Sequence, residues 1–372
     1  MKEETAVTDE QQGDEPARVP VIAHEEPDET TDVLPDETSA APPDVPQKHS
    51  PLWKDMLRVM LVYAGGYLAM QVVVSVIMTV FIVALDPQIQ TYLTGRTNMG
   101  ETLTAVMNDP ATSQFLLQRL SAYGMLTTIV GDLAAIALYL VIRKKKLVTT
   151  DITTTRAVNN RWLELGAALV FVLGIQLVLS LVDSLISLTG YDPSSVQANL
   201  LGSDTSTVVG FVGIVIIVPF LEEWMFRGAV LRQLAPYGAN FAIVTQALLF
   251  AFWHSNLYQG VFAFVVGLVL GYVAYNFSLK WSYALHATSN ATAFLFGASW
   301  MPEWAGWTFF SLACAASIVI IVYFRKVVPL LVAEGASTTD HPFRQGWRNP
   351  AFIAIVAVMF VICCVMMVVA GS

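Results

Sequence analysis

The sequence predicts an all-α fold: a polytopic transmembrane helical bundle with a disordered acidic amino-terminal tail. Of the 372 residues, 55% are hydrophobic and only 13% are charged, about half the charged fraction of an average soluble domain. Apolar runs of about 20 residues, long enough to cross a bilayer, recur along the chain. Basic residues gather in alternate connections between these runs. Together these observations predict a multi-pass protein of the cell membrane.

The first 50 residues form the predicted tail. They contain 14 of the 29 acidic residues and no long apolar run. Such a segment cannot bury enough apolar surface to offset the entropy lost on ordering. It also has no basic start followed by an apolar stretch, so we do not expect a cleaved signal peptide. We therefore expect residues 1–50 to be a disordered cytoplasmic tail.

Nine apolar runs follow the tail, and each is a predicted span. Residues 51–160 hold two amino-terminal spans with their connecting loops, 161–298 form a central core, and 299–372 hold two carboxy-terminal spans. The nine runs lie near 56–85, 120–142, 162–189, 207–235, 239–254, 257–277, 280–298, 304–324 and 350–370.

The basic residues predict the orientation of the spans. If the amino terminus is cytoplasmic, only two of the basic residues near span ends lie on the outer side of the membrane. They are Arg96 and Arg119, in a long outward loop over residues 86–119. The positive-inside rule favours this arrangement and an odd number of spans. The basic residues on the cytoplasmic side are Lys48, Lys54, Arg58, Arg143 to Lys146, Arg156, Arg161, Arg325, Lys326, Arg344 and Arg348.

Two glycines in the sixth predicted span indicate a close helix contact. Gly267 and Gly271 are four residues apart, the spacing that lets the backbones of two membrane helices approach each other. We expect this face of the span to pack against a neighbouring helix.

Charged residues interrupt the fourth predicted span in the stretch VPFLEEWMFRGAVL. A charge inside a bilayer costs at least a few kcal/mol. Glu223 and Arg227 are four apart, so they share a helix face and can form an ion pair. Glu222 lies about 100° around the same helix and needs another partner or a function. Pro219 removes a backbone hydrogen bond nearby, which loosens the helix and frees a carbonyl.

Two further spans carry polar residues at the same helical spacing. Phe250 and His254 are four apart in FAFWH, where the aromatic ring can shield the imidazole from lipid; His286 and Asn290 are four apart in HATSN. Together with Glu222 they match a general base, an orienting imidazole and a pair of polar donors. Taken singly, each residue also has a structural interpretation, and Asp132 in the second span is interpreted as structural because no second polar residue converges on it.

These motifs resemble those of the CPBP intramembrane proteases. EEWMFR is similar to the EExxxR motif of that family, FAFWH to FxxxH, and HATSN to HxxxN. The family includes type II CAAX prenyl endopeptidases and bacteriocin-processing or self-immunity (Abi-like) proteins. The resemblance covers roughly residues 160–300, which makes the central core, 161–298, the expected catalytic part.

The resemblance implies a role for each motif residue. Glu222 would activate a water molecule with help from His254, and His286 and Asn290 would bind the developing oxyanion. The supporting residues would be Glu223, Arg227 and Phe250. The implied activity is that of an intramembrane glutamic endopeptidase acting on a peptide or protein substrate, membrane-associated or lipidated, within the lipid bilayer. No nucleic-acid partner and no cofactor are expected.

Three alternatives stay open from the residues alone. Glu222, His254 and His286 also form the His₂Glu set of a catalytic zinc site, although Asn290 has no role as a zinc ligand. A non-enzymatic membrane scaffold or immunity protein would keep the motifs for packing. A transporter would use the buried charges as a substrate site, but no inverted repeat is apparent.

Overall fold

The computed structural model describes residues 51–93, 101, 104, 108–143, 161–188, 208–296, 300–324 and 339–371. They belong to one compact unit, His49–Ser372. Over these residues the regular structure is helical and contains no strand, as the sequence predicts. The predicted tail, residues 1–50, and the basic stretch 144–160 lie outside the described residues.

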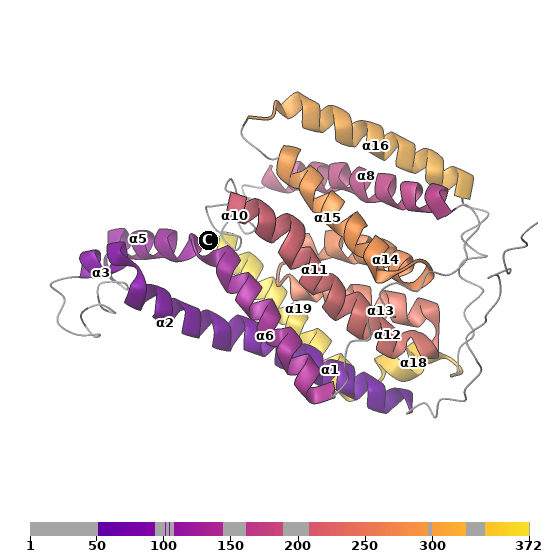
Figure 1. The fold of residues 1–372 in the computed structure, drawn as a ribbon, viewed down its shortest axis with the longest axis horizontal. Coiled ribbons are helices and arrows are strands. Elements are labelled where there is room, and N and C mark those ends of the chain that lie inside the picture. The colour runs from indigo at the N-terminus through magenta and orange to yellow at the C-terminus, as the bar shows by residue number, and fades with distance from the viewer. Residues whose placement is uncertain are drawn as a thin grey trace, which may run out of the picture. The chain divides into compact units, whose positions relative to one another are not determined.

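The long helices coincide with the predicted apolar runs (Figure 1). In several places short π-helical segments, labelled η1 to η3, continue an α-helix without a break, and a 3₁₀ turn, η4, ends one run. In chain order the segments are α1 (Leu52–Leu68), η1 (Ala69–Val74) and α2 (Ser75–Leu85); α6 (Gly124–Arg143); α8 (Arg161–Ser187); α10 (Val208–Phe211), η2 (Val212–Ile217), α11 (Val218–Glu223), η3 (Trp224–Leu231), α12 (Arg232–Leu234) and η4 (Ala235–Tyr237); α13 (Ala239–Trp253); α14 (Leu257–Asn276); α15 (Leu279–Phe296); α16 (Glu303–Phe324); α18 (Pro342–Trp347); and α19 (Pro350–Gly371).

Several of these helices can cross a bilayer. By length and composition, four described helices qualify on their own: α8, α14, α16 and α19. Two bent pairs bring the number to six if each pair is one span: α2 with α3 (Pro87–Leu93), bent by 73°, and α5 (Pro110–Ser121) with α6, bent by 57°. The chain is therefore a multi-pass membrane protein. The count of nine spans and the cytoplasmic amino terminus stay predictions.

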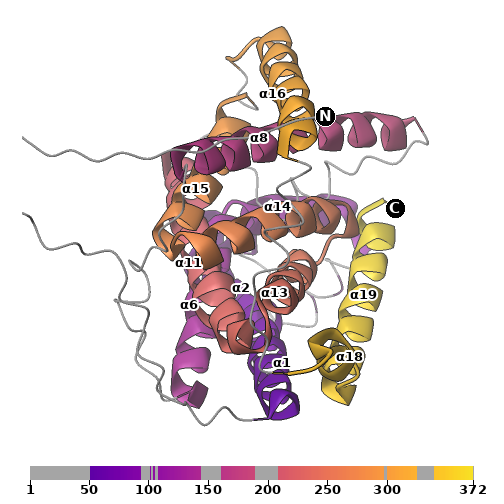
Figure 2. The ribbon, with the colours of Figure 1, turned by 90° about the vertical axis from the view of Figure 1, so that its right-hand side faces the viewer.

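The outer helices expose apolar side chains in the way that a lipid-facing surface requires. Leu312 and Val319 on α16 are each 68% exposed, and Val358 on α19 is 57% exposed. Contiguous exposed apolar surface of this kind marks contact with a membrane or a partner. Figure 1 shows α16 beside α8 and Figure 2 shows it crossing α8 at an angle; the two helices are in contact, so one side of α8 is covered by protein.

The outward loop predicted over residues 86–119 contains two helices that the apolar pattern did not indicate, α3 and α5. Each begins with an aspartate followed by proline. Asp86 accepts backbone hydrogen bonds from Gln88 and Ile89, and Asp109 accepts one from Ala111. Aspartate at the N-cap with proline at the first helical position is a helix-start signal. The prediction of an outward loop rested on hydrophobic length and did not consider these helix-start signals.

Two apolar clusters hold the helices together. One lies between α1, η3, α13 and α19 and includes Met60, Phe226 and Trp253; the other lies between α8, α14 and α15 and includes Val172 and Leu270. The helices α13 and α14 pack closely against each other (Figure 2), and α14 contributes side chains to both clusters. The motif residues of the central core lie on α11, η3 and α15 and at the C-terminal end of α13.

Gly267 is expected to tolerate no side chain. A Cβ atom there would lie 3.2 Å from the Cα atom of Ala247 on α13 and 3.3 Å from the ring of Phe250, which confirms the predicted close contact. Gly267→Leu should therefore lower the free energy of unfolding by about 1–3 kcal/mol through overpacking. The measurement is denaturation of the purified protein in mixed micelles. Gly166→Leu on α8 is the matched control, because a Cβ atom there meets nothing within 4 Å. Equal stability of the two variants would contradict this packing.

Candidate active site

The two adjacent glutamates lie on α11, between the π-helical segments η2 and η3. In η2 the Val218 N–H donates to the carbonyl of Gly213, five residues earlier. Pro219 has no N–H with which to continue this pattern to the carbonyl of Ile214. The Asn290 amide nitrogen donates to that carbonyl instead, at 3.0 Å. The carbonyl that Pro219 was predicted to free is therefore bound by a motif residue of α15.

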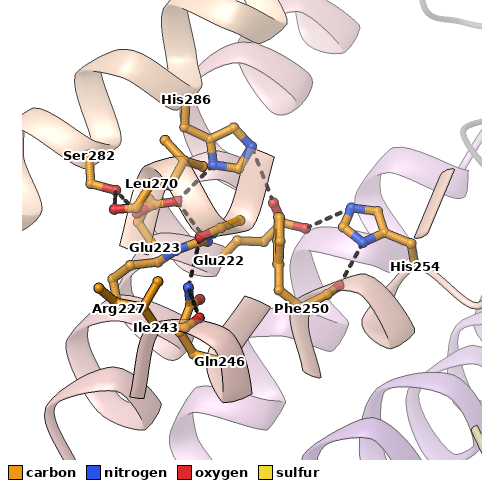
Figure 3. Close-up of polar contacts among 11 residues, drawn as sticks. Glu222, Glu223, Arg227, Ile243, Gln246, Phe250, His254, Leu270, Ser282 and His286 are labelled. Carbon is orange, nitrogen blue, oxygen red and sulfur yellow. Dashed lines mark hydrogen bonds and ion pairs between the residues drawn. The ribbon is translucent and has the colours of Figure 1, made fainter. Parts of the chain in front are cut away.

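Glu223 is the centre of a buried polar cluster (Figure 3). Its Oε1 atom lies 2.9 Å from Nη1 of Arg227, and the two side chains are 1% and 0% exposed. This is the ion pair that the four-residue spacing predicts. The same oxygen accepts a hydrogen bond from His286 Nδ1 at 3.0 Å, and Oε2 lies 2.5 Å from the Ser282 hydroxyl. Glu223 thus joins α11 to α15 and holds the ring of His286.

Glu222 points away from this cluster, toward two imidazole rings (Figure 3). Its Oε1 atom is 3.9 Å from Nε2 of His254, and its Oε2 atom is 3.7 Å from Nε2 of His286. Its side chain is 9% exposed, against 1% for Glu223. These gaps are longer than a direct hydrogen bond, and a polar contact of this length can be mediated by a water molecule.

The hydrogen bonds of the two rings set which nitrogen faces Glu222. His254 Nδ1 lies 2.9 Å from the carbonyl of Phe250, and a carbonyl can only accept, so Nδ1 carries the hydrogen. His286 Nδ1 likewise donates to the carboxylate of Glu223. In the neutral rings, Nε2 is therefore the lone-pair nitrogen, and both lone pairs are turned toward Glu222.

Phe250 walls the polar groups off from their surroundings. Its ring makes edge contacts with His254, at a centroid distance of 4.8 Å, and with His286, at 5.9 Å. The Arg227 guanidinium lies over the same ring, 4.3 Å from the centroid. A cation over an aromatic face is stabilised by the ring quadrupole. One aromatic side chain therefore packs against both histidines and the buried cation.

The four predicted catalytic residues line one cavity of about 1570 Å³. Glu222, His254, His286 and Asn290 form one part of its wall. Other parts come from α2, α5, α6 and α8, which precede the core motifs in the chain. Polar side chains from these helices include Ser75, Thr79, Gln114, Gln118, Thr128 and Gln176. The cavity has room for a peptide segment as well as water.

Asp132 on α6 also lies in the cavity wall. It is 2% exposed and close enough to Glu222 for the two carboxylates to interact electrostatically. The structural interpretation of Asp132 assumed that no polar residue converges on it, and that assumption was wrong. No local pattern indicates this interaction, because Asp132 and Glu222 are 90 residues apart in the chain.

Two polar residues of the site were not identified from the sequence. Ser282 lies one turn before His286 on α15 and is within hydrogen-bond distance of Glu223; its four-residue spacing from His286 was the available signal. Gln176 on α8 donates to the Ser289 hydroxyl at 3.3 Å. A single glutamine in an apolar helix carries no signal for that contact.

The donor types at this site suit zinc, but their spacing does not. Two imidazole nitrogens and one carboxylate are ligands that zinc prefers, and zinc-bound histidines usually donate their other N–H to an acceptor, as both rings do here. In the part of the chain that the structure describes, no group of three His, Cys, Asp or Glu side chains converges closely enough to hold a metal ion.

Comparison with known proteins bears on the same part of the chain. Residues 204–292 match the family model of the type II CAAX prenyl endopeptidases, described as Rce1-like. The match includes the glutamate pair, His254, His286 and Asn290. No curated protein and no solved structure matches the chain.

Proposed function

We propose that Glu222 is the general base of peptide hydrolysis by this protein. The premise is that the chain belongs, through residues 204–292, to the CPBP family of CAAX-type intramembrane endopeptidases. The observation that carries this proposal is the position of Glu222. Its two carboxylate oxygens each face an imidazole nitrogen, at 3.9 and 3.7 Å, in the wall of a cavity large enough for a peptide. A carboxylate so placed can take a proton from a water molecule held between it and the rings.

The proton balance of the reaction follows from this placement. A water oxygen attacks the peptide carbonyl carbon, and the proton that it loses goes to Glu222. His254 orients the water, because its Nε2 lone pair can accept the second water hydrogen. When the tetrahedral intermediate collapses, the carbon–nitrogen bond breaks and the leaving amine takes the proton from Glu222. The carboxylate is then ready for another cycle.

His286 and Asn290 are the proposed donors to the oxyanion. One amide hydrogen of Asn290 is used by the Ile214 carbonyl, so the second is left to donate. His286 Nδ1 donates to the Glu223 carboxylate, so Nε2 is the ring atom left to face the oxyanion, and it donates when both ring nitrogens carry hydrogen. Donors aimed at the developing charge lower the barrier because they need no reorganisation during the reaction. Glu223 and Arg227 position the site and do not touch the peptide.

Asn290→Ala is expected to have two separable effects. Loss of the bond to Ile214 should cost about 1–3 kcal/mol of stability, and loss of an oxyanion donor should lower the cleavage rate by about 10²–10³-fold. Adding Pro219→Ala should restore stability, because the new backbone N–H at position 219 can bond the Ile214 carbonyl. Cleavage should stay low. Unfolding and peptide hydrolysis are measured on both variants. A double variant that recovers both properties would show that Asn290 acts only through the helix.

The experiment that tests the function is a comparison of membrane peptides. Membranes from cells that make the wild-type protein are compared with membranes from cells that make equal amounts of Glu222→Gln, and released peptides are identified by mass spectrometry. The proposal expects peptides whose new ends appear only with the wild type. Identical peptide sets would favour a non-enzymatic scaffold.

One observation favours a second mechanism, in which the same residues bind zinc. Both imidazoles turn the lone pair of Nε2 toward Glu222, and these lone pairs could bind the metal ion together with the carboxylate. The absence of a converging group of three ligands among the described residues favours the metal-free mechanism. Metal analysis of the purified protein and assay of cleavage after exhaustive chelation separate the two. The metal-free mechanism expects activity to persist, and activity lost on chelation and restored by zinc would overturn it.

A further inference from the structure

We propose that Tyr67 and Ser255 form a brace that positions His254 for catalysis. Tyr67 lies on α1, outside residues 204–292, and Ser255 directly follows His254. The hydroxyl groups of the two residues lie 2.6 Å apart and are buried. The catalytic part of this inference rests on the proposed function, since it concerns the histidine that orients the water.

The backbone at Ser255 has an unusual conformation. Its φ angle is +55°, and among the described residues only His341 is another non-glycine residue with positive φ. Side chains of L-residues disfavour this left-handed region, and serine lacks the tolerance of asparagine or glycine. Such a conformation persists where surrounding contacts hold it, and it occurs often at functional sites. The side-chain contact that holds Ser255 is its hydroxyl bond to Tyr67.

The left-handed turn connects the end of α13 to the start of α14. The Ser255 N–H donates to the carbonyl of Phe252 at 3.1 Å. Asn256 then caps α14, because its side chain accepts the N–H of Tyr258 at 3.0 Å. The turn is therefore tied to the helix on either side, and its conformation sets where α13 stops.

The position of His254 depends on that turn. His254 is the C-cap residue directly after α13, where the chain reverses, and its Nδ1 is held by the carbonyl of Phe250. The ring of Tyr67 also packs edge-on against Trp253, with a centroid distance of 5.7 Å. Tyr67 thus contacts the residue on each side of His254. If Ser255 relaxes to an ordinary backbone conformation, His254 Nε2 shifts relative to Glu222, and a shift of about 1 Å can cost about 10²-fold in rate.

A neighbouring tyrosine provides a matched control. Tyr63 lies one turn before Tyr67 on α1 and packs edge-on against the same Trp253, at 5.6 Å. Its buried hydroxyl has no hydrogen-bond partner among the described residues. Tyr63→Phe and Tyr67→Phe both remove one hydroxyl and keep the ring packing. Only Tyr67→Phe removes the bond to Ser255.

The first test measures hydrolysis of a peptide identified in the membrane comparison. Tyr67→Phe is expected to lower kcat by about tenfold with KM unchanged, and Tyr63→Phe to leave both unchanged. In the double variant with Tyr67→Phe, Ser255→Gly is expected to restore kcat toward the wild-type value, because glycine adopts positive φ without strain. Equal kcat values for the two tyrosine variants, or no rescue by glycine, would overturn the brace.

The second test needs no substrate and therefore separates the brace from the proposed function. Diethyl pyrocarbonate modifies unprotonated imidazoles, and peptide mapping by mass spectrometry gives the rate at His254, with the exposed His341 as internal reference. Tyr67→Phe is expected to change the His254 rate severalfold, Tyr63→Phe to leave it unchanged, and Ser255→Gly to restore it in the double variant. If the wild type cleaves nothing, the proposed function fails while this comparison still tests the brace. Equal His254 rates in the two tyrosine variants would refute it.

Discussion

Glu222→Gln is expected to lower the rate of peptide hydrolysis by about 10²–10⁴-fold, the usual contribution of a general base. A carboxamide has almost the same shape as a carboxylate but cannot take a proton from water. Stability should change little, because the ion-pair contacts of Glu222 among the described residues, to the two imidazoles, are 3.7 and 3.9 Å long and are not direct hydrogen bonds. The measurement is turnover of an identified peptide by purified protein, together with the unfolding transition of the same sample.

Glu223→Gln is the matched control for this prediction, since it makes the same chemical change one residue further along α11. It should lower stability, because Glu223 pairs with Arg227 and His286 at full burial. The two variants therefore separate a loss of the hydrolysis rate from a loss of stability. A Glu222→Gln protein that cleaves at the wild-type rate would remove Glu222 from the reaction, and a scaffold would show this result.

Arg227→Met is expected to lower the free energy of unfolding by about 3–5 kcal/mol, the usual cost of breaking a buried ion pair by removing one partner. Methionine fills much of the volume of the arginine stem, but it leaves the Glu223 carboxylate, 1% exposed, without its cation. An uncompensated charge in this environment is more costly than the loss of the pair itself. Stability is measured by denaturant titration in mixed micelles.

Two variants sharpen this second prediction. Glu223→Gln combined with Arg227→Met leaves no buried charge in the pair and should recover part of the lost stability. Arg58→Met serves as the control, because Arg58 pairs with Asp55 at 2.9 Å while its own side chain is 53% exposed; exposed pairs contribute less than about 1 kcal/mol. If Arg227→Met were as stable as Arg58→Met, the Glu223 cluster would not support the fold.

The helices were predictable because they depend on local properties of the chain. A run of about 20 apolar residues forms a membrane helix wherever it lies, and the observed boundaries of α8, α14 and α16 fall close to the predicted ones. The pairing of Glu223 with Arg227 was predictable for the same reason, since residues four apart on a helix are neighbours. The α3 and α5 helices were missed although their Asp–Pro starts are equally local.

The sequence by itself therefore determined which segments are helical, where the charges of the central core lie, and that Glu222 and Glu223 have different surroundings. Only the tertiary structure decided which imidazole nitrogen faces Glu222, that Asn290 binds the Ile214 carbonyl, and that Asp132 and Tyr67 reach the same cavity. The physical reason is that spacing within one helix is set by the helix geometry alone. A contact between α1 or α6 and the central core depends instead on how remote helices pack, which no local pattern records.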